Sequence, residues 1–120
     1  MPSTRVISTT IPANEALSGG IDIGDAAFVG IEMPEGWAGT QITFQAKAKN
    51  KEDVNNDPAL EDYDNVYDSA GNELVVTVAA NRIVTDIPEL SPLRFIRIRS
   101  GTSGTPVNQN PAREIRIIAK

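Results

Sequence analysis

Apolar and polar residues alternate along several short stretches of the chain. In Thr40–Ala48 every second residue from Ile42 onward is apolar, and the residues between them are polar. Leu93–Ser100 and Arg113–Ala119 place isoleucines on the same two-residue period, with charged residues between them. A period of two with one polar face predicts strands that bury one side in an antiparallel sheet.

Stretches rich in valine, isoleucine and threonine occur elsewhere between turn residues. β-Branched side chains favour strands over helices. The nine glycines and eight prolines punctuate the chain at the spacing of short antiparallel strands. We therefore expect further strands at Ser3–Ile11, Ala26–Met33, Tyr63–Tyr67, Glu73–Ala79 and Ile83–Thr85, and Ile21–Ile23 is a candidate short strand.

The stretch Ala26–Met33 also predicts side-chain directions. In a regular strand, successive side chains point to opposite faces. Strict alternation therefore places Val29, Ile31 and Met33 on one face and Phe28 on the other.

The order of these elements predicts an all-β fold. No helix-length segment separates any two of the strands, so parallel β–α–β units are excluded. We expect a single antiparallel β-sandwich over residues 1–120, jelly-roll-like or immunoglobulin-like, with seven or eight strands. Residues 1–12 are interpreted as an N-terminal arm, and the polar residues 49–62 as a long acidic loop.

Composition removes several classes of function. The chain contains no cysteine and no histidine, which excludes disulfides, thiol nucleophiles, Cys or His metal sites and imidazole catalysis. Its net charge of −5 disfavours nucleic acid as a partner. No apolar run approaches the roughly 20 residues of a membrane helix, and the N-terminus lacks the pattern of a secretory signal. We expect no enzymatic activity, no cofactor, no nucleic-acid partner and no membrane partner.

An acidic segment includes one weak candidate cation site. From Glu52 to Glu73 there are eight carboxylates and no cation. Oxygen ligands alternate as in a calcium loop, but the sixth position is Pro58 where that loop needs glycine, and the twelfth is an aspartate. The alternative interpretation is a solvated loop. The candidate ligands are Asp53, Asn55, Asp57 and Asp64.

Basic residues gather near the C-terminus, where Glu114 is the one acid between positions 94 and 120. Such a stripe can dock onto an acidic neighbouring subunit or bind phosphates, or it can form ion pairs within the fold. Phe95 is the one aromatic residue beside it, which disfavours stacking on single-stranded nucleic acid. The stripe consists of Arg94, Arg97, Arg99, Arg113, Arg116 and Lys120.

Trp37 follows directly after a Pro-Glu-Gly turn and allows two interpretations. At an exposed loop tip it would offer a platform for a sugar. Beneath the turn it would cap the core, as large aromatic residues often do in small domains.

Five short motifs together resemble a family of small structural proteins encoded among the virion genes of tailed bacteriophages. They are Met-Pro-x-x-Trp, Ile-Thr-Phe-Gln, Tyr-Asp-x-x-Gly, Arg-Ser-Gly-Thr and Pro-Val-Asn-Gln. They lie in Phe28–Ala46, Val66–Val84 and Leu93–Ile118, which cover over half of the chain. The segment Lys49–Asp62 departs from the family pattern, because it is longer than the turn expected there.

The resemblance implies a component of the phage head, made in the host cytoplasm. It favours a capsid cement or decoration protein that binds the major capsid protein or other virion subunits and forms a homo-oligomer. The alternatives are a head-spike, tail or connector component, or a receptor- or glycan-binding module of the virion. The polar N-terminal strand and the loop after Ser100 are the expected docking elements. The loop residues that match the family pattern are Gly101, Thr102, Pro106, Val107, Asn108 and Gln109.

Overall fold

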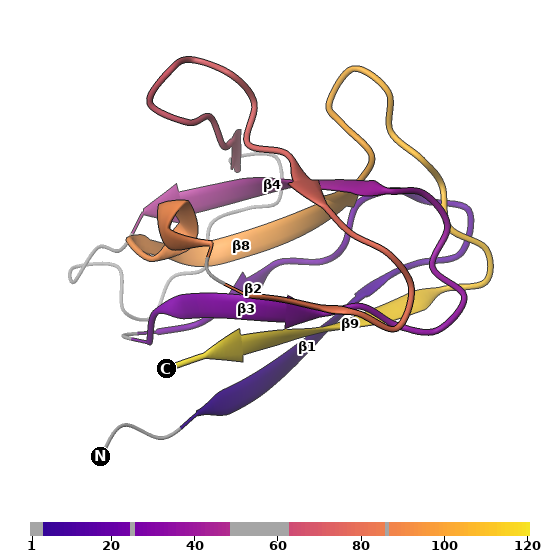
Figure 1. The fold of residues 1–120 in the computed structure, drawn as a ribbon, viewed down its shortest axis with the longest axis horizontal. Coiled ribbons are helices and arrows are strands. Elements are labelled where there is room, and N and C mark those ends of the chain that lie inside the picture. The colour runs from indigo at the N-terminus through magenta and orange to yellow at the C-terminus, as the bar shows by residue number, and fades with distance from the viewer. Residues whose placement is uncertain (1–3, 25, 49–62, 86) are drawn as a thin grey trace.

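A computed structural model describes residues 4–24, 26–48, 63–85 and 87–120 of the chain. Two antiparallel sheets pack face to face, and the only helical element among these residues is a single 3₁₀ turn at Pro88–Leu90. Figure 1 shows the two layers, with β1, β3 and β9 in the lower one and β4 and β8 in the upper one. The predicted all-β sandwich is confirmed.

The first sheet has four strands in the order β1-β9-β3-β7. They are β1 (Arg5–Ile11), β9 (Arg113–Ala119), β3 (Phe28–Glu32) and β7 (Ile83–Thr85). The first and last strands of the chain are therefore neighbours (Figure 1). β1 forms the edge of this sheet, so residues 5–11 belong to the sandwich and do not form a separate arm.

The second sheet has five strands, built around its two longest members. β8 (Leu93–Ser100) pairs with β4 (Gln41–Ala48), and β2 (Ile21–Asp22) lies on the other side of β8. β5 (Asp64–Asn65) and β6 (Val76–Thr77) both pair with β4. The described residues thus form nine strands, where the sequence predicts seven or eight. The ninth is the two-residue strand β2, which lies in the candidate segment Ile21–Ile23.

The core lies between the sheets and follows the predicted alternation. Ile42, Phe44 and Ala46 of β4 are buried, as are Ile115 and Ile117 of β9. The predicted strand Glu73–Ala79 is shorter than expected, yet its residues Leu74 and Val78 enter the core and Val76 packs against it. Burial of apolar surface, at about 25 cal/mol per Å², supplies most of the driving force for folding.

A β-bulge corrects the prediction for Phe28. The register between β3 and β9 shifts between Phe28 and Gly30, so two residues of β3 occupy the space of one. The shift turns Phe28 to the same side as Ile31, and both are buried. The Phe28 ring meets the edge of Phe44 with centroids 6.2 Å apart. The expectation that Phe28 lies on the opposite face is therefore wrong.

Candidate functional site

The arginines of β8 are held inside the fold. Arg94 is buried and forms a two-point contact with Asp22 of the neighbouring strand β2. Its Nε donates to Oδ1 of Asp22 at 2.8 Å, and its Nη2 donates to Oδ2 at 2.9 Å. The guanidinium also lies 4.7 Å from the ring centroid of Phe95. Arg94 therefore joins β2 to β8 instead of facing a neighbouring subunit.

The Arg94–Asp22 pair predicts a specific sensitivity to acid. The hydrogen bond from Arg94 holds the pKa of Asp22 below its ordinary value, although burial acts in the opposite direction. Because the pKa is lower in the folded state, this carboxylate stabilises the fold above the unfolded pKa of about 3.9. That stabilisation is lost as the pH falls through the lowered pKa. We expect Asp22→Asn to flatten the pH dependence of the thermal midpoint below pH 4; parallel curves for variant and wild type would refute this.

Arg99 is also buried and lies in a polar cluster on the outer side of the second sheet. Its Nη2 donates to Oδ1 of Asn65 at 2.8 Å, and its Nη1 lies 3.3 Å from Oγ1 of Thr43. The same Nη1 lies 3.4 Å from Oε2 of Glu73. The core covers one face of β8, and this polar cluster covers the other. Within the cluster, Arg99 pairs with Glu73, a carboxylate of the acidic segment.

Arg97 lies between these two residues and is half-buried. Its Nε donates to the carbonyl oxygen of Ser18 at 2.8 Å, and its guanidinium lies 5.8 Å from the centroid of the Tyr63 ring. Burial is the main cause of a lowered pKa for this group. Pairing within the fold, one of the three interpretations of the stripe, therefore describes Arg94, Arg97 and Arg99.

The loop after β8 is fixed by its own residues. Gly101 adopts a φ of +83°, and a Cβ there would collide with the carbonyl oxygen of Thr105. Gln109 is fully buried, and its side chain bonds both the N–H and the C=O of Ala38, at 3.1 and 2.7 Å. Its Nε2 also lies 2.7 Å from Oγ of Ser100. Gly101 and Gln109, expected as docking residues, hold the loop in place.

The other candidates in this loop reach the surface to different degrees. Pro106 and Asn108 are exposed, whereas Thr102 and Val107 are half-buried. The buried Gln109 beside them anchors the backbone, so this part of the loop presents its side chains from a fixed position.

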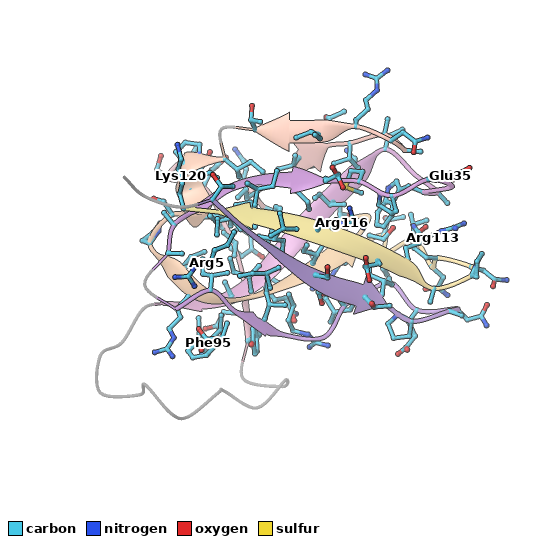
Figure 2. The ribbon with its side chains drawn as sticks, turned by 90° about the horizontal axis from the view of Figure 1, so that it is seen from below. Arg5, Glu35, Phe95, Arg113, Arg116 and Lys120 are labelled. Carbon is cyan, nitrogen blue, oxygen red and sulfur yellow. The ribbon has the colours of Figure 1, made fainter. Side chains whose placement is uncertain are left out.

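Arg113 and Arg116 line an open hollow of about 290 Å³ beside the first sheet. Figure 2 labels both arginines, together with Glu35. Arg116 is exposed and lies 3.3 Å from Oε1 of Glu32 and 3.7 Å from Oε1 of Glu114. Nη2 of Arg113 donates to the carbonyl oxygen of Asn110 at 3.3 Å. The hollow is lined by Glu32, Met33, Pro34, Glu35, Ala112, Arg113, Glu114 and Arg116. Because both glutamates and arginines line the hollow, its charges favour neither an anionic nor a cationic ligand.

Trp37 is only 7% exposed and belongs to the core. The core-capping interpretation is confirmed, and the alternative interpretation, a sugar platform at an exposed Trp37, is wrong. The sequence does not distinguish the two interpretations, because the same Pro-Glu-Gly turn precedes Trp37 in both. Only the packing of the sheets decides where the ring lies.

The candidate calcium ligands Asp53, Asn55 and Asp57 lie outside the described residues. Asp64 is described, lies on β5 and forms an exposed ion pair with Lys47 at 2.8 Å. Among the described residues, no three Asp or Glu side chains gather closely enough to hold a metal ion. Within the same ranges, no helix has the length and apolar character needed to cross a membrane.

The outer face of the first sheet is a surface of which the sequence indicated only a part, namely the N-terminal strand and Arg116. It consists of the side chains that point away from the second sheet. Val6 and Ile83 are 60% and 57% exposed, and Ile118 is half-buried directly opposite Val6. Apolar and polar residues do not alternate in Arg5–Ile11, because Val6 and Ile7 are adjacent, so the sequence shows neither the exposure of Val6 nor that this strand forms an edge. The outer face is made of Val6, Ser8, Thr10, Glu32, Ile83, Thr85, Glu114, Arg116 and Ile118.

Comparisons of the chain with protein-family models, with curated proteins and with solved structures found no match.

Proposed function

We propose that the chain is a non-enzymatic structural protein of a tailed-bacteriophage virion, and specifically a capsid cement or decoration protein that binds the major capsid protein. Such a protein is made in the host cytoplasm and resides on the phage head. The five motifs described above support the virion assignment by resemblance. The observation that supports docking is the exposed outer face of the first sheet, which Figure 2 views directly.

The outer face has the composition of a protein-binding surface. Exposed apolar side chains lie toward both edges, with Val6 on β1 and Ile83 on β7. Between them, Glu32 and Arg116 form an exposed ion pair at 3.3 Å. Apolar contacts supply affinity in a protein interface, and charged groups fix orientation and partner choice. The pattern suits a protein partner that offers its own apolar positions and complementary charges.

Polar contacts hold together the scaffold behind this face. The Arg94–Asp22 pair, the polar cluster at Arg99 and the buried Gln109 each join segments that are far apart in the sequence. A protein that strengthens a shell works by holding its binding surface in a fixed shape, since flexible surfaces lose conformational entropy on binding. The internal use of these polar groups therefore agrees with a structural role.

Deletion of the gene from its phage tests the proposal. We expect mass spectrometry to find the protein in wild-type particles at hundreds of copies, as a shell component requires, and we expect deleted particles to break at a lower temperature. About a dozen copies per particle would instead indicate a neck or tail ring. Absence of the protein from purified particles would overturn the virion assignment altogether.

A variant of the outer face tests the docking surface. We expect Ile83→Asp to reduce the amount of protein bound per particle by roughly tenfold, because a buried unpaired carboxylate costs more than 1.4 kcal/mol at an interface. Tyr67→Asp is the matched control, since Tyr67 is 56% exposed but follows β5 of the second sheet. Equal binding of the two variants would exclude the outer face as the docking surface.

A further inference from the structure

β1 is a long strand at the edge of the first sheet. It pairs with β9 over all seven residues from Arg5 to Ile11, and within the described residues it has no second ladder partner. Successive peptide groups of a strand point alternately to its two sides, so about half of the N–H and C=O groups of β1 point away from β9. These groups form a template for another strand.

The edge lacks the features that usually prevent strand addition. Arg5–Ile11 contains no proline and no lysine, and its register with β9 has no bulge. Its one charged residue is Arg5, at the beginning of the strand. Natural edge strands are commonly protected by charges, prolines or bulges. In Figure 2, β1 is the outermost strand of the sheet, next to β9.

We propose that β1 pairs antiparallel with β1 of a second copy of this chain, about a two-fold axis that passes through Ser8, so that the two four-stranded sheets become one of eight strands. This inference concerns an interface between copies and holds whether or not the protein binds a phage shell.

The register at Ser8 follows from the strand itself. Ser8 is the central residue of Arg5–Ile11, so this register is the one that pairs all seven residues. It also preserves the two faces: the exposed residues Val6 and Thr10 meet each other, and the inward residues Ile7 and Thr9 meet each other. β-Branched side chains form favourable cross-strand pairs.

The charges permit the same arrangement. Arg5 lies opposite Ile11 of the second copy, so the two Arg5 side chains sit at opposite ends of the pair, roughly 20 Å apart at 3.4 Å per residue. The two Arg116 residues are separated by three strand spacings, about 14 Å. Both distances exceed the screening length of about 8 Å at physiological salt. Neither of these two pairs of like charges therefore meets across the axis.

Pairing would also cover exposed apolar surface. Val6 is 60% exposed and has Ile118 opposite it on β9. In the paired sheet its free side would be flanked by Thr10 of the second copy. A single pair of edge strands buries less than the roughly 1,600 Å² of a standard interface, so we expect a dimer that forms at high protein concentration and dissociates on dilution.

Cysteine cross-linking tests the register, because the natural chain contains no cysteine. In an antiparallel pair, only the residue on the axis meets its own copy, at a Cα distance of 4.5–5.5 Å that fits a disulfide. We expect purified Ser8→Cys protein under mild oxidation to form a reducible dimer in most of the sample. Val6→Cys alone is the matched control and should stay monomeric, because its copies would lie about 14 Å apart.

A mixture of Val6→Cys and Thr10→Cys proteins provides the second measurement. We expect a mixed disulfide between the two variants at a yield at least tenfold above that of either variant alone, since these positions face each other in the proposed register. Equal cross-linking of all single-cysteine variants would indicate random collision and overturn the proposal. So would an entirely monomeric Ser8→Cys protein with a wild-type melting curve, whatever the particle experiments show.

Discussion

Replacing Arg99 with alanine is expected to lower the free energy of unfolding by about 3 kcal/mol. The substitution leaves Glu73 with a carboxylate that is largely removed from water and has lost its cation. It also removes the donor for Asn65 Oδ1, which lies 2.8 Å from Nη2 of Arg99. Removing one member of a buried ion pair costs about 3–5 kcal/mol, because the remaining charge has no partner. Urea unfolding monitored by circular dichroism measures the change.

Arg116→Ala is the matched control for this experiment. Arg116 also pairs with glutamates, but the pair with Glu32 is exposed on the outer face. Exposed ion pairs contribute only about 0–1 kcal/mol. We expect Arg116→Ala to change the free energy of unfolding by less than about 0.5 kcal/mol. If the two variants were equally stable, the cluster around Arg99 would not stabilise the fold by the expected amount.

Gln109→Ala is expected to destabilise the protein by a similar amount, about 3 kcal/mol. The side chain is fully buried and makes three hydrogen bonds, two to the backbone of Ala38 and one to Ser100. Each buried polar group left without a partner costs about 1–3 kcal/mol. The substitution leaves the buried hydroxyl of Ser100 without its donor and removes the partner of the N–H and C=O of Ala38. Because Ala38 is exposed, water can bond its backbone groups and recovers part of the loss.

The neighbouring Asn108 supplies the comparison. It is exposed, so Asn108→Ala should change the free energy of unfolding by no more than about 0.5 kcal/mol. Gln109→Glu keeps the volume but removes the donor to the Ala38 carbonyl and to Ser100, and we expect a loss at least as large as for alanine. A Gln109→Ala variant with the urea midpoint of the wild type would show that the loop is held by its backbone alone.

Both predictions bear on where the protein binds its neighbours. Arg99 and Gln109 belong to motifs that resemble the phage family, as do Trp37 and Phe44, and all four are buried. These motif positions therefore maintain the fold. Docking onto another protein must use residues that reach the surface, and the outer face of the first sheet offers such residues. For this reason the proposed binding surface shares only Arg116 with the arginine stripe that the sequence first indicated.

The sequence by itself determined the class of fold and much of the core. The two-residue period in Thr40–Ala48 and Arg113–Ala119 is a local property of extended backbone, so it predicts both the strands and their buried sides. Turn residues such as Pro34 and Gly36 separate the strands for equally local reasons. Absence of cysteine and histidine likewise excludes whole classes of chemistry from composition alone.

The tertiary structure decided what covers each surface. The bulge that turns Phe28 inward depends on the register with β9, and the burial of Arg94 and Arg99 depends on neighbours at distant positions in the chain. The free side of β1 is likewise a consequence of strand order. An alternating pattern predicts that one face of a strand is polar. That face can lie in solvent or in a buried polar cluster, and the pattern is the same in both cases. Only long-range packing distinguishes them, because the partners of a polar side chain are set by the arrangement of the sheets.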